Sequence, residues 1–136
     1  MKSYLIAFIL VFVAWFLTDF LIHGIILKAT YAATAALWRP EAEMNRGLAT
    51  LVTAIAALAF TGIYGALINP KSMAAGIKFG MLYGLAAGVS MGLGSYCYMP
   101  IPIGLALMWF VGTLIQMVIA GAIVGTAIKT SPPEAG

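Results

Sequence analysis

The chain has 136 residues, of which 63% are hydrophobic and 8% are charged, and its formal net charge is +3. Soluble domains carry about 25% charged residues, because a polar surface must cover their core. The composition therefore excludes a soluble globular domain, a disordered chain and a nucleic-acid-binding protein, and its single cysteine excludes an internal disulfide.

Four apolar segments are long enough to cross a bilayer. A membrane-spanning helix needs about 20 mostly apolar residues, and long apolar runs without strict alternation indicate helices, not barrel strands. The segments that meet this requirement are 4–27, 47–68, 74–95 and 103–128. We therefore predict an all-α fold, in which one polytopic membrane domain forms a four-helix bundle.

The first span carries two ionisable side chains near its C-terminal end. Asp19 and His23 are four residues apart, so they share one face of an α-helix. Ionisable groups within a span usually face a partner or a water-filled cavity. The pair either fixes the register of the bundle or handles a proton or cation.

The apolar run of the first span is too long for a signal peptide, so we expect an uncleaved helix.

A longer connection, 28–46, follows the first span. It predicts a short helix lying at the membrane interface, because three residues share one helical face: Tyr31, Ala35 and Trp38. Trp38, Arg39 and Pro40 are assigned to the interface, where tryptophan is typical of the aromatic belt. Pro40, followed by acidic residues, also indicates that the second helix begins nearby.

The third span carries a glycine at every fourth position. This glycine ladder consists of Gly76, Gly80, Gly84, Gly88 and Gly92. Small residues at this spacing let two helices approach closely in lipid. The fourth span has a shorter matching set that includes Gly121 and Gly125. The ladder therefore either packs these two spans together or forms a face for another copy or a different subunit.

The fourth span carries Gln116 near its centre. An amide at this depth usually forms an interhelical hydrogen bond, and the alternative is a contact with a substrate. The tail after this span, 129–136, contains two consecutive prolines and is expected to be mobile.

A soft-metal site is a further possibility. The first and third connections open on the same side, which brings His23, Cys97 and Met99 toward one layer. Imidazole, thiolate and thioether together favour an ion such as Cu(I). No established ligand spacing is present, so we expect no cofactor. No nucleophile and base lie at a recognisable spacing either, and we expect no enzyme.

The sequence Trp38-Arg39-Pro40 after the first span, followed by three Gly- and Ala-rich spans, resembles small uncharacterised bacterial four-helix integral membrane proteins. The resemblance implies a four-helix membrane fold in the bacterial cytoplasmic membrane, and it implies no activity. The side of the membrane that holds both termini carries four basic residues and the opposite side carries three, which favours placing both termini in the cytoplasm.

Three functions fit these observations. The first is a non-catalytic accessory or structural subunit, assembled through the glycine ladder into a homo-oligomer or a larger membrane complex. The second is a small transporter or channel for an ion, a proton or a solute, which uses Asp19 and His23 and is lined by Gln116. The third is a metal-handling membrane protein.

Overall fold

The structure, a computed structural model, describes residues 1–129, and its regular structure over that range is helical. Four helical spans are long and apolar enough to cross a membrane: Lys2–Ile26, Arg46–Leu67, Met73–Tyr98 and Ile103–Ala127. The predicted all-α fold with four membrane helices is confirmed, and the protein is an integral membrane protein in contact with lipid. The predicted mobile tail, 129–136, lies outside the described residues except for Lys129.

Two of the spans change helix type along their length. The first is α1 (Lys2–Asp19) continued by the π-helical segment η1 (Phe20–Ile26). The third, which extends beyond the predicted 74–95, consists of α4 (Met73–Gly88), the π-helical segment η4 (Val89–Gly94) and α5 (Ser95–Tyr98). The other two spans are the α-helices α3 (Arg46–Leu67) and α6 (Ile103–Ala127).

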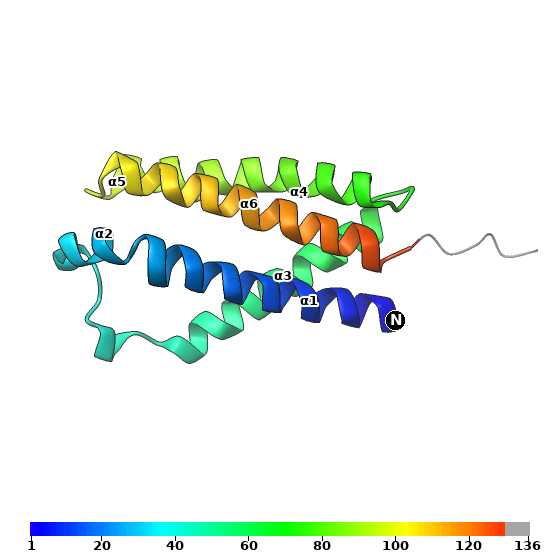
Figure 1. The fold of residues 1–136 in the computed structure, drawn as a ribbon, viewed down its shortest axis with the longest axis horizontal. Coiled ribbons are helices and arrows are strands. Elements are labelled where there is room, and N and C mark those ends of the chain that lie inside the picture. The colour runs from blue at the N-terminus through cyan, green and yellow to red at the C-terminus, as the bar shows by residue number, and fades with distance from the viewer. Residues whose placement is uncertain (130–136) are drawn as a thin grey trace, which may run out of the picture.

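The helix α6 is the central element of the bundle. Figure 1 shows α1, α4 and α6 side by side along the long axis, with α3 inclined to them. The most extensive packing joins α4 to α6, and α1 packs on both α6 and α3. A buried cluster that includes Trp15, Phe60 and Tyr64 joins these helices. A second, smaller cluster contains Leu27 and Leu105, at the end where the first connection lies.

The glycine ladder packs the third span against α6 of the same chain. All five of its glycines are buried. A β-carbon on Gly76 would collide with the carbonyl oxygen of Gly121, and one on Gly80 would collide with that of Met117. The two backbones are therefore in direct contact, which only residues without a β-carbon permit. Because α6 covers this face, the structure favours packing within one chain, and assembly with another subunit through the ladder stays a prediction.

The first connection contains the predicted short helix. It begins with α2 (Lys28–Ala33) and a 3-10 turn, η2 (Ala35–Leu37). A second 3-10 turn, η3 (Glu41–Glu43), follows Pro40. The connection is therefore a series of single turns, and it lies beside the C-terminal end of the first span (Figure 1).

The second span begins later than Pro40 indicates. Pro40 precedes only the turn η3, and the backbone of Met44 is extended. The helix itself begins at Arg46, because Asn45 caps it: its side-chain oxygen accepts a hydrogen bond from the Leu48 N–H at 2.9 Å. The prediction of a start near Pro40 is wrong, because a proline and first-turn acids favour one helical turn without ensuring that it continues.

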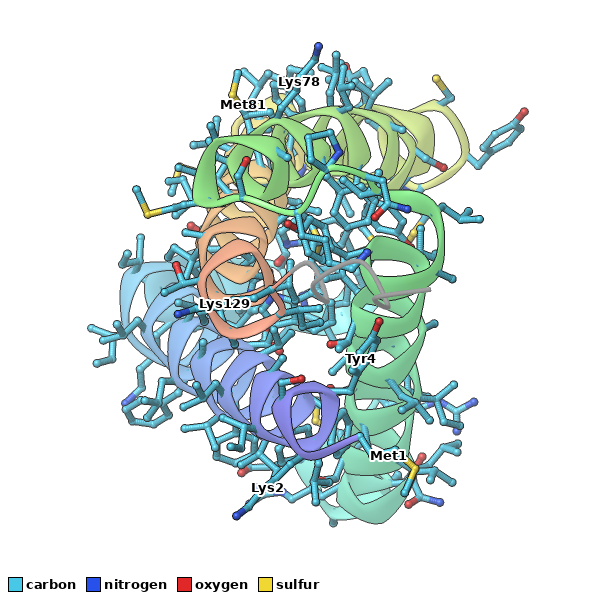
Figure 2. The ribbon with its side chains drawn as sticks, turned by 90° about the vertical axis from the view of Figure 1, so that its right-hand side faces the viewer. Met1, Lys2, Tyr4, Lys78, Met81 and Lys129 are labelled. Atoms are coloured by element: carbon cyan, nitrogen blue, oxygen red, sulfur yellow. The ribbon has the colours of Figure 1, made fainter. Side chains whose placement is uncertain are left out.

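The two ends of the described chain lie at the same end of the bundle, as an even number of spans requires. Figure 2 looks onto this end and shows Lys2 and Lys78 near its periphery and Lys129 at the end of α6, with Tyr4 directed toward α3. The Tyr4 hydroxyl donates a hydrogen bond to the carbonyl oxygen of Gly65 at 3.1 Å. Which side of the membrane this end faces stays a prediction.

Replacing Tyr64 by phenylalanine is expected to lower the free energy of unfolding by about 1–2 kcal/mol. The Tyr64 hydroxyl is part of a reciprocal contact with Ser72: it donates to the Ser72 carbonyl oxygen at 3.0 Å and accepts from the Ser72 N–H at 3.1 Å. Phenylalanine leaves both backbone groups without this partner. Thermal unfolding in detergent, followed by circular dichroism, measures the change. Tyr98→Phe, at a side chain that is 91% exposed, is the control and should leave stability unchanged.

Candidate functional site

The predicted polar residues of the first and fourth spans meet in the structure. The Gln116 amide nitrogen on α6 donates to Asp19 Oδ1 at 2.7 Å and to Thr18 Oγ1 at 2.9 Å. Gln116 itself is buried, and its backbone carbonyl oxygen accepts a hydrogen bond from Trp15 Nε1 at 3.2 Å. The interhelical hydrogen bond predicted for Gln116 is therefore present, and its main partner is the carboxylate of Asp19.

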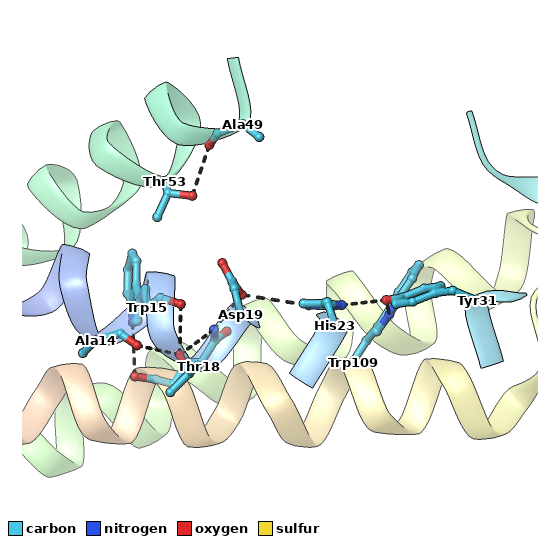
Figure 3. A network of polar contacts seen from close by, with 10 residues as sticks. Ala14, Trp15, Thr18, Asp19, His23, Tyr31, Ala49, Thr53 and Trp109 are labelled. Atoms are coloured by element: carbon cyan, nitrogen blue, oxygen red, sulfur yellow. Dashed lines mark hydrogen bonds and ion pairs between the residues drawn. The ribbon is translucent and has the colours of Figure 1, made fainter. Parts of the chain in front are cut away.

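The chain of polar contacts continues from Asp19 toward the first connection. His23 Nε2 lies 3.9 Å from Asp19 Oδ1, too far for a direct hydrogen bond. His23 Nδ1 lies 2.6 Å from the Tyr31 hydroxyl oxygen, which accepts a hydrogen bond from Trp109 Nε1 at 2.8 Å. Figure 3 shows this line of side chains from Thr18 to Tyr31 beside α6.

The partners of Tyr31 indicate how protons are placed along this line. An indole nitrogen only donates, so the Tyr31 oxygen accepts from Trp109 and its own proton is available to His23 Nδ1. Burial raises the pKa of Tyr31 above its ordinary value, the hydrogen bond from Trp109 opposes this, and the charge of Asp19 adds to it. Tyr31 therefore stays protonated at neutral pH. With Nδ1 as the acceptor, the neutral His23 ring carries its proton on Nε2, directed toward Asp19.

The π-helical segments lie on two sides of the same stretch of α6. In η1 the Leu27 N–H donates to the Ile22 carbonyl oxygen at 2.8 Å, a bond across five residues. A β-carbon on Gly112 of α6 would meet Ile22, and one on Gly92 of η4 would meet Ala106. Single π-helical turns within longer helices are common at functional sites because the wider turn displaces the side chains that follow it.

A groove of about 980 Å³ opens beside the polar chain. One wall belongs to the first span, and the first connection and the start of α3 form the rest. Its lining residues are aromatic, apolar and charged: Phe16, Asp19, Phe20, His23, Gly24, Lys28, Tyr31, Ala35, Trp38, Arg39, Pro40, Glu41, Met44 and Arg46. The side chains of Asp19 and His23 are 45% and 44% exposed there. A site of this size accommodates a small organic molecule.

A second cavity of about 160 Å³ lies on the α6 side of the same pair. Asp19 and His23 line both this cavity and the groove. The cavity is also lined by residues from η1, η4 and α6, among them Ile22, Met91 and Trp109. The two ionisable side chains therefore form part of the wall between the two spaces.

The basic side chains of the site lie in the first connection and at the start of α3. Arg46 forms an ion pair with Glu41 at 2.5 Å, and both side chains are largely exposed. Lys28 and Arg39 are exposed as well and line the groove. The part of the groove within the first span carries the acidic side chain of Asp19. The site thus has a basic rim and an acidic interior end.

The interface residues predicted from the sequence form part of this site. Trp38, Arg39 and Pro40 line the groove. The ring of Trp38 packs edge-on against Tyr31, with 5.4 Å between ring centroids, and its Nε1 donates to Thr34 Oγ1 at 2.9 Å. We predicted an interfacial position for Trp38, and the structure shows that Trp38 also lines a groove.

The residues of the metal hypothesis have other partners. Cys97 Sγ contacts the carbonyl oxygen of Leu93 at 3.4 Å, and His23 bonds Tyr31. Within residues 1–129, no three His, Cys, Asp or Glu side chains form a group that could hold a metal ion. The set His23, Cys97 and Met99 therefore receives no support from the described part of the chain.

Sequence reasoning missed three members of the polar chain: Thr18, Tyr31 and Trp109. A signal for Trp109 is present, because it lies seven residues before Gln116 and thus on the same face of α6, with Gly112 between them. Tyr31 lies beyond the end of the span, so its return to His23 depends on the turns of the connection, which periodicity does not describe.

Comparisons with known proteins identify no relative of this chain: no family model, no curated protein and no solved structure matches it. The resemblance based on Trp38-Arg39-Pro40 therefore stays an expectation.

Proposed function

We propose that the protein is a small membrane transporter that binds an amphiphilic solute in the groove, with Asp19 and His23 at its polar end. The observation that carries this proposal is the half-exposed pair of ionisable side chains inside a span, facing a groove of about 980 Å³. Ionisable groups in a span are costly and usually mark the path of a substrate or an ion. The aromatic and apolar lining suits the rest of the solute.

The placement of the pair between two cavities supports transport over simple storage. Asp19 and His23 can exchange a solute or a proton with the groove on one side and with the small cavity on the other. Toward the N-terminal end of the first span, the chain of polar contacts ends at Gln116. Beyond Gln116, the side chains of Trp15, Phe60 and Met117 pack together in a buried cluster. This apolar seal favours a transporter with alternating access over an open channel.

The other two hypotheses have weaker support. An accessory subunit requires a free packing face, and the glycine ladder is covered by α6. Assembly into a homo-oligomer or a larger membrane complex stays a prediction, as does the absence of an enzymatic activity. The location in a bacterial cytoplasmic membrane, with both termini in the cytoplasm and the groove near the opposite surface, depends on the resemblance and on the count of basic residues.

Uptake into proteoliposomes tests the proposal. We expect wild-type protein to accelerate entry of at least one of three fluorescent amphiphiles (one cationic, one anionic, one zwitterionic) under an imposed pH gradient. Asp19→Asn removes the interior charge without changing its size and should reduce the protein-dependent rate at least tenfold. Glu43→Gln is the matched control, because Glu43 is an exposed acid that does not line the groove. Equal rates in Asp19→Asn and wild type, or no uptake above protein-free vesicles, would refute the proposal.

A further inference from the structure

We infer that the groove selects a lipophilic cation, such as an amine or a quaternary onium ion carried on an aromatic or aliphatic body. This inference rests on the proposed function, since it names the class of solute for the same groove. It follows from the placement of the charges, from the aromatic lining and from the geometry of the Asp19 carboxylate.

Asp19 presents an incompletely bound carboxylate to the groove. Its Oδ1 accepts the hydrogen bond from Gln116, while Figure 3 shows the second oxygen pointing away from α6, toward the side of α3. The nearest basic group is His23 Nε2, 3.9 Å from Oδ1. A carboxylate in an apolar surrounding is unfavourable unless a positive charge accompanies it. A cationic ligand in the groove supplies that charge.

Aromatic side chains line the same groove as this carboxylate. Phe16 and Phe20 flank Asp19 on the first span and line the same groove, as do Tyr31 and Trp38 of the connection. The faces of aromatic rings attract cations, and the attraction is strongest where water is excluded. A carboxylate together with several rings is the combination that binds an organic cation whose own surface is apolar.

The positions of the basic residues argue against an anionic solute. Lys28 and Arg39 belong to the connection, whereas Asp19 lies seven residues before the end of the span, about 10 Å along the helix. An anionic headgroup would stay at the basic rim, where Arg46 is already bound to Glu41. It would be repelled from Asp19, so the interior end of the groove would stay unused.

Two ions of nearly equal size and opposite charge provide the test: tetraphenylphosphonium and tetraphenylborate. Equilibrium dialysis with the purified full chain in a non-ionic detergent measures the affinity of each. We expect the wild-type protein to bind the phosphonium at least tenfold more tightly than the borate. Asp19→Asn should weaken phosphonium binding at least tenfold, and Asp19→Glu, which keeps the charge, should retain most of it. Glu43→Gln should bind like the wild type.

Circular dichroism and size-exclusion chromatography establish that each variant is folded. If Asp19→Asn does not fold, Phe20→Leu is the second variant, and it should weaken phosphonium binding about threefold through loss of a ring face. Tighter binding of the borate, or phosphonium binding that is unchanged in the folded variants, overturns the inference. If the borate binds and Trp38→Ala weakens it, the groove is a binding site but not for cations. Binding of neither ion also overturns the inference, and the uptake experiment then decides the proposed function separately.

Discussion

Replacing Gly80 by valine is expected to destabilise the bundle by about 3 kcal/mol, because the new side chain has no space against α6. A β-carbon at this position would collide with the Met117 carbonyl oxygen and lie 2.9 Å from its carbonyl carbon. A flexible side chain could rotate away, whereas the backbone of a helix cannot move without displacing the whole of α4 or α6. Unfolding in a mixed detergent series, followed by circular dichroism, measures the loss.

Gly62→Val is the matched control for this experiment. Gly62 lies in the second span, and nothing lies within 4 Å of a β-carbon built there. The same substitution should therefore change stability by less than about 0.5 kcal/mol. Equal stability of Gly80→Val and Gly62→Val would contradict the close packing of α4 on α6. If Gly80→Val instead abolished a larger oligomeric particle without lowering the stability of the monomer, the ladder would be a face between subunits.

Replacing Gln116 by leucine is expected to lower stability by about 2 kcal/mol and to lower the proposed transport activity as well. Leucine has a similar volume, but it removes the two hydrogen bonds to Thr18 and Asp19. The carboxylate of Asp19 then loses its closest donor inside the span. Thr126→Val is the control on the same helix, because Thr126 is exposed and its hydroxyl bonds only the Ala122 carbonyl oxygen among the described residues.

A double-mutant cycle identifies the source of this loss. If the Asp19–Gln116 bond carries most of it, Gln116→Leu should have a smaller effect in an Asp19→Asn background than in the wild type. Unfolding of the four proteins under the conditions used for Gly80→Val provides the data. Strictly additive losses would indicate that the two side chains do not interact, and the polar chain would then lack the link between Asp19 and Gln116.

The packing of the third span shows which structural features the spacing of glycines predicts and which it does not. The five glycines indicate a stripe of small residues along one face of the helix, and that stripe is buried against α6. The same pattern is equally compatible with another chain as the partner. The choice depends on whether Gly121 and Gly125 lie opposite Gly76, which the loop between the two spans determines.

The residues of the candidate site were likewise predicted from the sequence only in part. Asp19, His23 and Gln116 stand out in the sequence because polar groups are costly in hydrocarbon, and the structure joins Asp19 to Gln116. The roles of Tyr31 and Trp38 were predicted only in part. Both are aromatic residues near an interface, and nothing in their spacing indicates that the connection folds back to form a groove with the first span.

The amino-acid sequence by itself determined that four helices span a membrane, because an apolar segment in lipid must satisfy its own backbone hydrogen bonds. That requirement is local, so it can be read from each segment alone. Tertiary structure alone decided that α6 covers the glycine ladder and that Asp19 and His23 lie between a groove and a cavity. Those features depend on which helix faces join and on the path of the connection, and both are set by packing between residues distant in the chain.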